Sequence, residues 1–355
     1  MKKILFISFV SVAGLAFGQQ DIQFTQTASS PFLINPAAGG LMNVAEVVLG
    51  NRLQYVGVEG RPMTTFAGIQ SMVRFKKRKS KALLSELSSI GQTFYSTPQR
   101  TVSYKQVAGL TFVNDIIGPF TRTNVKANLG VHIPLSQKLN AGIGLGIGWS
   151  NFGIDNSKVK LGTENDKAYA NYIGISASQN YLDAQAGLVV YNDRLLVSLS
   201  GSQIFNNKTR LSTITTESNF QPHLFVLASY RFDLGKSKKY GLEPIVQFRS
   251  VKHAPVSYDV AMRLHYMRMG WLSLSYRRQS AIGVGFGINL LARFNVSYSF
   301  EFGNGVTEKF GNTSHEIRLG FIFGHKRNMD KEFRQDEKTN PAPEEVKPEE
   351  TKPQE

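Results

Sequence analysis

The sequence predicts an all-β protein: a transmembrane antiparallel β-barrel of the outer-membrane type, with about fourteen strands. Three observations lead to this fold class. Strand-length segments carry apolar residues at every second position, an export signal begins the chain, and no later apolar run is long enough for a membrane helix. An exported chain without such a helix is either soluble or a barrel, because only helices and closed barrels satisfy their backbone hydrogen bonds in lipid.

The segment Leu139–Ser150 shows the pattern most clearly. Apolar side chains occupy every second position, and asparagine, glycine and serine lie between them. Successive side chains of a strand point to opposite faces, so this strand has one apolar face and one nearly bare face. Its length suits a tilted strand that crosses a bilayer in about 9–11 residues, whereas an ordinary strand has about 5–6. An edge or sandwich strand of a soluble β protein is the alternative.

Similar segments recur along the rest of the chain. The predicted strands are Val44–Tyr55, Met63–Arg74, Ser103–Asn114, Thr121–Pro134, Leu139–Phe152, Tyr181–Tyr191, Leu195–Phe205, Pro222–Phe232, Tyr240–Ser250, Tyr258–Met267, Gly270–Arg278, Ile282–Asn289, Arg293–Phe302 and Ser314–Phe323. In a water-soluble barrel the apolar set would face inward. A barrel of this size encloses a lumen too wide for side chains to fill, so we expect apolar residues to face lipid and polar residues the lumen.

Charged residues on the polar faces agree with this arrangement. Lys126, Arg293 and Glu301 alternate with large apolar residues, which suits a water-filled lumen. The same pattern suits the outer face of a soluble sandwich. Closure of the barrel is therefore inferred from the number and length of the strands.

The connections between the predicted strands alternate between tight and long, as outer-membrane barrels require. Asn192–Asp193 and Arg268–Met269 are tight, while Val73–Val102 and Gly153–Asn180 are long. The first long connection contains the basic run Lys76–Lys81, followed by leucines at helical spacing. Two structures would account for this pattern: a short amphipathic helix at the mouth or in the lumen, or a solvated basic turn.

The chain divides into four parts. Residues 1–18 form a secretory signal, with two lysines, an apolar core and small residues at the cleavage site. Residues 19–43 form an irregular entry segment, whose apolar patch Phe32–Ile34 must pack against the inner wall or mouth of the barrel. Residues 44–325 form the barrel. Residues 326–355 form a charged Pro/Glu-rich tail, expected to be disordered and, with an even number of strands, periplasmic.

Composition narrows the possible chemistry. The chain has no cysteine, which excludes disulfides and cysteine-ligated metals. Its net charge of +15 comes from 41 basic and 26 acidic residues. The basic residues are scattered among strand-like segments and form no nucleic-acid-binding signature. Basic groups that face anionic lipid phosphates or line a lumen are the better account.

No motif for catalysis or for cofactor or metal binding stands out. Gly142–Gly146 and Gly283–Gly287 are similar to phosphate loops only superficially, because such loops join a strand to a helix. We expect these glycines to mark a face that a plug or a neighbouring backbone approaches closely. The six histidines lack metal-binding spacing. Asp155, Glu164 and Asp166 lack the ordered spacing of a calcium loop.

Short motifs follow one another near both ends of the mature chain. They are Gln20-Asp21-x-Gln23-Phe24-x-Gln26, Asn35-Pro36-Ala37 with Gly39-Gly40, Asn51-Arg52-x-Gln54-Tyr55-Val56-Gly57, Gly60-x-Pro62-x-Thr64, Tyr258–Arg263, Trp271–Arg277, Tyr298–Phe302 and Ser314–Gly320. In order and placement, the chain resembles the PorP/SprF family, outer-membrane proteins of the type IX secretion and gliding-motility apparatus of Bacteroidota. The resemblance covers Gln20–Phe323. It departs at Ala38, where the family has an aromatic residue, and at Tyr55, where it has tryptophan.

The resemblance implies an outer-membrane barrel that supports secretion or surface attachment of cargo with a C-terminal signal, such as adhesins. The implied partners are that cargo, periplasmic and outer-membrane components of the type IX machinery, and outer-membrane lipid, but no nucleic acid. It implies no catalytic residue and no cofactor. The motif positions carried over are Asn35, Pro36, Arg52, Gln54, Gly57 and Gly60. We expect them to seat the entry segment and the first hairpin, with contact to cargo as the alternative.

Two other functions stay open at this point. A general or substrate-selective diffusion channel would use the lysines and asparagines of the polar face to line a pore. A barrel enzyme would need a serine and a histidine that meet in space, and the sequence nominates neither.

Overall fold

The computed structural model describes most of the chain between residues 24 and 323. The described residues are 24–41, 45–73, 105–136, 139–159, 178–205, 208–210, 217–219, 221–235, 239–251, 254–267, 269–278, 280–290, 293–304 and 313–323. The chain divides into the units Met1–Phe323 and Gly324–Glu355, and all described residues belong to the first. The signal, the basic run Lys76–Lys81 and the tail lie outside them.

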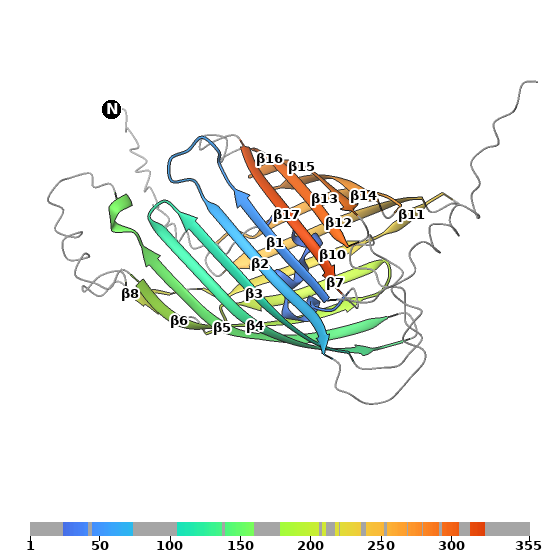
Figure 1. The fold of residues 1–355 in the computed structure, drawn as a ribbon, viewed down its shortest axis with the longest axis horizontal. Helices are drawn as coiled ribbons and strands as arrows, with labels where there is room; N and C mark the ends of the chain where they lie inside the picture. The colour runs from blue at the N-terminus through green and yellow to red at the C-terminus, as the bar shows by residue number, and fades with distance from the viewer. Residues whose placement is uncertain are drawn as a thin grey trace, which may run out of the picture. The chain divides into compact units, whose positions relative to one another are not determined.

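Fourteen strands form a closed antiparallel barrel (Figure 1). They are β1 (Ala45–Leu53), β2 (Met63–Val73), β3 (Lys105–Ile117), β4 (Phe120–Pro134), β5 (Asn140–Ile154), β6 (Ser178–Tyr191), β7 (Leu195–Ser202), β10 (His223–Tyr230), β12 (Tyr240–Val251), β13 (Ser257–Tyr266), β14 (Gly270–Arg277), β15 (Ala281–Leu290), β16 (Phe294–Gly303) and β17 (Thr313–Phe323). Each pairs with its neighbours along the chain, and β1 pairs with β17 to close the ring. The predicted fold class is confirmed, and every predicted segment overlaps one strand.

Three short strands of the described residues lie outside this ring. Among the described strands, β11 (Phe232–Leu234) pairs only with β12, while β8 (Lys208–Arg210) and β9 (Glu217–Asn219) form a separate two-stranded sheet. The helical elements in the described part of the chain are short, and none is long and apolar enough to cross a bilayer.

The strands turn their apolar faces outward. In β5, the side chains of Ile143, Leu145 and Ile147 are 54–64% exposed, whereas Gly142, Gly144 and Gly146 between them are buried. A soluble barrel or sandwich would hide the large apolar side chains instead. The outward apolar face on a closed ring therefore excludes the soluble alternative and is the surface that lipid covers in outer-membrane barrels.

The two ends of the barrel differ in their connections. We call the end where β1 begins and β17 ends, at the pair Ala45 and Phe323, the lower rim, and the opposite end the upper rim. Short turns join strands at the lower rim, for example between β6 and β7 and between β13 and β14. The predicted alternation has exceptions at both rims. The long connection between β2 and β3 lies at the lower rim, while β3 and β4, and likewise β14 and β15, are joined by tight turns at the upper rim.

An apolar row and a polar row run side by side across the outer face of β1 to β6. In register, the apolar row is Leu49, Ala67, Phe112, Val125, Trp149 and Leu182, and the polar row, two residues nearer the upper rim, is Asn51, Thr65, Asn114, Thr123, Asn151 and Asn180. Side chains of the polar row bond to one another, as Asn51 does to Thr65 (2.9 Å) and Asn151 to Asn180 (2.7 Å). This change of polarity marks where hydrocarbon gives way to the polar interface.

Substitution of Leu145 by arginine tests this assignment of faces. Leu145 lies in the middle of the apolar face of β5, so Leu145→Arg should lower the free energy of unfolding by about 2–4 kcal/mol in lipid vesicles. The control, Asn151→Arg on the same face of the same strand but in the polar row, should cost about 0–1 kcal/mol. Denaturant titration of the refolded barrel measures both. Equal losses for the two variants would contradict the assignment.

Candidate functional site

The entry segment, described over residues 24–41, lies inside the barrel. All of these residues except Thr25 are buried, and Figure 1 shows the segment as dark blue turns between the strands. None of them is charged. The segment forms three 3-10 turns, η1 (Thr27–Ser29), η2 (Pro31–Leu33) and η3 (Pro36–Ala38). Proline begins two of them, because its fixed φ and missing N–H suit the first helical position.

Asn35 attaches the segment to the side of the lumen formed by β6 and β7. Its Oδ1 accepts a hydrogen bond from the backbone N–H of Ala37 (2.8 Å) and so caps η3. Its Nδ2 donates to Ser198 Oγ (2.7 Å) and to the carbonyl oxygens of Leu188 (3.0 Å) and Leu199 (3.2 Å). One buried side chain thus orders the turn and holds it against two strands.

Two strand glycines make room for this turn. A Cβ on Gly144 of β5 would lie 2.3 Å from the backbone nitrogen of Ala37. A Cβ on Gly187 of β6 would lie 1.8 Å from Asn35 Oδ1. The predicted close approach is therefore confirmed at Gly144, where no larger residue fits between strand and turn. Gly142, Gly146 and the row Gly283–Gly287 instead meet side chains of neighbouring strands first.

Apolar side chains of the segment fill the middle of the lumen. The ring of Phe32 lies against β2, where a Cβ on Gly68 would be 2.5 Å from it. Phe24 packs edge to face on Phe66, with ring centroids 4.9 Å apart. The buried core of the described residues is thus built largely from the entry segment and the wall beside it. The apolar core of this protein therefore lies inside the barrel, where a porin has a polar, water-filled interior.

The wall around this uncharged segment carries buried charged residues that pair with one another. The pairs that no hydrogen bond joins to the segment include Lys126–Asp183 (2.8 Å), Arg249–Asp259 (3.0 Å) and Arg277–Asp259 (3.2 Å). Pairing is needed because an isolated buried charge costs several kcal/mol. Lys126 and Glu301 face the lumen as predicted, but the space around them is packed rather than water-filled. Arg293 lies in the exposed turn before β16 and not on the polar face.

Arg52 joins three strands and the entry segment near the upper rim. Its guanidinium, 2% exposed, lies 2.6 Å from Glu301 of β16 and 3.4 Å from Glu316 of β17, and it also contacts Thr25 Oγ1. Glu316 accepts hydrogen bonds from the backbone N–H groups of Thr25 (2.6 Å) and Gln26 (3.0 Å). Charged groups of the wall therefore bind the backbone of a segment that has no charge of its own.

A second cluster holds the segment near the lower rim. Arg318 of β17 pairs with Glu46 of β1 (2.9 Å) and donates from Nε to Ser30 Oγ (2.5 Å). Gln70 of β2 donates to Glu46 (2.7 Å) and accepts a hydrogen bond from the backbone N–H of Gly40 (2.8 Å). The entry segment therefore spans the lumen, with Thr25 near the upper rim and Gly40 near the lower rim.

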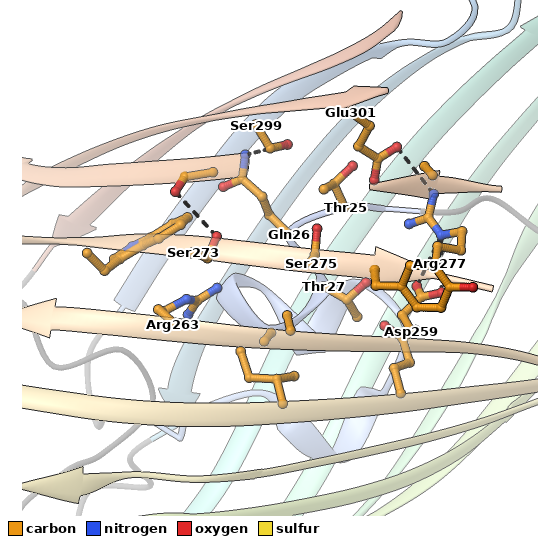
Figure 2. A pocket seen from close by; sticks show the side chains of 18 residues that line it. Thr25, Gln26, Thr27, Asp259, Arg263, Ser273, Ser275, Arg277, Ser299 and Glu301 are labelled. Atoms are coloured by element: carbon orange, nitrogen blue, oxygen red, sulfur yellow. Dashed lines mark hydrogen bonds and ion pairs between the residues drawn. The ribbon is translucent and has the colours of Figure 1, made fainter. Parts of the chain in front are cut away.

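A small cavity lies beside the segment, between Thr25–Ala28 and the strands β12 to β16 (Figure 2). Figure 2 shows Arg277 between Asp259 and Glu301 at one end of it. Its volume is about 40 Å³, room for only a few water molecules. Gln26 Oε1 and Trp271 Nε1 have no hydrogen-bond partner within the described residues, so water is the occupant that this lining fits.

The six motif positions lie in two places. Asn35, Pro36 and Arg52 are in the lumen, while Gln54, Gly57 and Gly60 are in the turn between β1 and β2 at the upper rim. The backbone N–H of Gln54 donates to Pro62 (2.9 Å). Gly57 and Gly60 have φ of +103° and +71°, which glycine adopts without strain. The carbonyl of Gly60 accepts from Gly118 N–H (2.9 Å), which joins this turn to the next one.

Sequence reasoning missed most of the wall residues that hold the segment. Glu316, Arg318, Glu46 and Gln70 were not singled out, although the motif Ser314–Gly320 contains the first two. Two charged residues two positions apart in that motif were the available signal. It placed both side chains on one face of a strand but could not name their partners.

The described residues contain no group of three or more side chains placed to hold a metal ion. Asp155 instead caps η5 (Asn156–Lys158), where it accepts hydrogen bonds from Ser157 Oγ (2.6 Å) and Ser157 N–H (3.1 Å) and pairs with Lys158 (3.0 Å). The Ser157 hydroxyl in particular holds the pKa of Asp155 below its ordinary value. Glu164 and Asp166 lie outside the described residues.

Substitution of Gly144 by alanine tests the close approach of wall and segment. The added methyl group would collide with the backbone of η3, so Gly144→Ala should lower the free energy of unfolding by about 1–3 kcal/mol. Gly201→Ala in β7 is the control, because its Cβ would meet nothing nearer than 3.8 Å and should change stability by less than about 0.5 kcal/mol. Denaturation midpoints of the two variants give the comparison. A neutral Gly144→Ala would mean that the segment does not lie against β5.

Comparison with known proteins gives a family. A family model described as type IX secretion system membrane protein PorP/SprF matches residues 16–321. No curated protein matches the chain. Similar solved structures include the outer membrane protein Omp33 of Acinetobacter baumannii (10% identity, TM-score 0.42, covering 79% of this chain and 99% of that one). The toluene transporters TodX of P. putida (10%, 0.43, 83% and 94%) and TbuX of Ralstonia pickettii (8%, 0.42, 82% and 92%) are also similar. Because the family model spans most of its length, the chain belongs to the PorP/SprF family of type IX secretion system membrane proteins.

Proposed function

We propose that this outer-membrane barrel is an accessory of type IX secretion or gliding motility, which supports the secretion or surface attachment of cargo proteins with a C-terminal signal. Family membership supports its place in that system. The filled lumen supports the accessory role itself. The entry segment occupies the lumen, and the cavities beside the segment measure about 40 Å³. A filled barrel offers no path for a protein through its interior, but it can anchor a partner in the membrane.

The orientation follows from the rims. Outer-membrane barrels have short turns and both chain ends on the periplasmic side. The lower rim has the start of β1, the end of β17 and short turns such as those between β6 and β7 and between β13 and β14. We therefore assign the lower rim to the periplasm, and with it the tail, residues 326–355, as a tether for periplasmic components of the machinery. The upper rim, with the turn that holds Gln54, Gly57 and Gly60, would face the cell surface and meet cargo.

The diffusion channel is the second candidate, and the polar wall of the lumen favours it. Buried arginines and carboxylates would line a conducting pore if the entry segment left the lumen. That departure would break the contacts of Arg52, Glu316, Arg318 and Gln70 with the segment at once. An open channel is therefore a costly state of this barrel. Neither the sequence motifs nor the described residues single out a catalytic group, so we propose no enzymatic activity.

Deletion of the gene tests the accessory role. One or more proteins with a type IX C-terminal signal should disappear from the cell surface or the medium, because their attachment or export needs this barrel. Mass spectrometry of surface and secreted fractions measures the loss, and a plasmid copy of the gene should reverse it. An unchanged secretome together with normal gliding would argue against the proposal.

Conductance separates the two candidates. Purified barrel in planar bilayers should give no stable single-channel steps, because the entry segment fills the lumen. A variant lacking residues 24–41, whose lumen would be empty, serves as the positive control and should conduct if it folds. Stable steps from the unmodified protein would favour the channel.

A further inference from the structure

We propose that the entry segment, beyond filling the lumen, is the element that closes the barrel by holding the first and last strands together. The place concerned is the seam, the pairing of β1 with β17 from Ala45 and Phe323 to Leu53 and His315. The segment forms hydrogen bonds with charged side chains on both sides of this seam, at two levels of the barrel, while its turn η3 packs against β4, β5 and β6.

The upper seam cluster consists of Arg52, Glu301, Glu316, Thr25 and Gln26. Arg52 on β1 reaches across the seam to Glu316 (3.4 Å) and Glu301 (2.6 Å). Glu316 is 1% exposed, and the segment provides two backbone N–H donors to its carboxylate. Gln26 Nε2 also donates to the carbonyl oxygen of Glu316 (3.3 Å). Without the segment, this buried carboxylate would depend on a single long ion pair.

The lower seam cluster consists of Glu46, Gln70, Arg318, Ser30 and Gly40. Glu46 on β1 pairs with Arg318 across the seam. Ser30 Oγ accepts from Arg318, and Gln70 links Glu46 to the backbone N–H of Gly40. At this level too, both charged side chains of a cross-seam ion pair are connected to the segment by hydrogen bonds, Arg318 directly and Glu46 through Gln70. Both clusters are complete only when β1, β17 and the entry segment are present together.

The pairing of β1 with β17 is the strand pairing with the most to gain from additional stabilising contacts. Glu46 and Arg318 are 272 residues apart in the chain, and Arg52 and Glu316 are 264 apart. Contacts between distant residues require the largest loss of chain entropy before they stabilise anything. The entry segment directly precedes β1, so its binding to β17 brings the first strand to the last. Buried ion pairs then become favourable, because their hydrogen-bonding groups are satisfied.

Two neighbouring serines allow a matched test. Ser30 bonds to Arg318 at the seam, while Ser29 bonds to Arg263 of β13 (3.0 Å), away from it. Both are buried, at 3% and 4% exposed. Ser30→Ala and Ser29→Ala remove the same hydroxyl from adjacent positions of the same segment. A segment that only fills space would respond alike to both changes, whereas a closing element would respond at the seam to the first alone.

Hydrogen exchange of the purified barrel in detergent, resolved by peptide, provides the measurement. Ser30→Ala should speed exchange of the β1 and β17 amides about tenfold, since a hydrogen bond to a charged group is lost there. Exchange in β4 and β5 should not change. Ser29→Ala should act on β13 and leave the seam as it was. Thr25→Val, which removes the hydroxyl at Arg52, should reproduce the seam effect at the upper level.

Either of two outcomes would overturn the proposal. One is equal acceleration at the seam in Ser29→Ala and Ser30→Ala. The other is no acceleration at β1 and β17 in Ser30→Ala and Thr25→Val. Single hydroxyl deletions leave the lumen filled, so all three variants should fold well enough to be measured. The readout is independent of cargo, and so its result stands whether or not the accessory role holds.

Discussion

The structure depends on the pairing of charges that the barrel turns inward. A charge buried without a partner costs several kcal/mol, and the lumen holds many: Arg52, Arg318, Glu46, Glu301 and Glu316 are each no more than 5% exposed as side chains. They pair with one another across strands, and the entry segment forms further hydrogen bonds with Arg52, Glu316 and Arg318. Because that segment carries no charge, it completes the network without unbalancing it.

The same constraint links the wall to its contents. Alternation with period two sends large apolar side chains to the lipid and leaves the other face free for polar groups or glycine. Where the wall is polar, as at Glu316, it binds the backbone of the segment. Where it is bare, as at Gly144 and Gly187, the turn around Asn35 approaches it directly. A lumen closed in this way suits a barrel that anchors partners better than one that conducts.

The site residues that the sequence predicted belong to short local motifs, whereas the partners that the structure shows lie far from them along the chain. Asn35, Pro36 and Arg52 were singled out by short motifs, and the close approach at Gly144 was expected from glycines within a strand. The partners were not foreseeable, because Arg52 meets Glu301 and Glu316 at separations of 249 and 264 residues. The apolar patch Phe32–Ile34 predicted packing against the inner wall or mouth of the barrel, but nothing local in residues 24–41 tells that the whole segment spans and fills the lumen.

The sequence alone determined the class of fold, the approximate number of strands and the division of each strand into an apolar and a polar or bare face. Each of these is a local property, since the spacing of apolar residues within one segment decides which side of a strand meets lipid. Only the tertiary structure decided what fills the barrel and what closes it. Both depend on contacts between the beginning and the end of the chain, such as Thr25 with Glu316, and these arise only when β1 and β17 are neighbours.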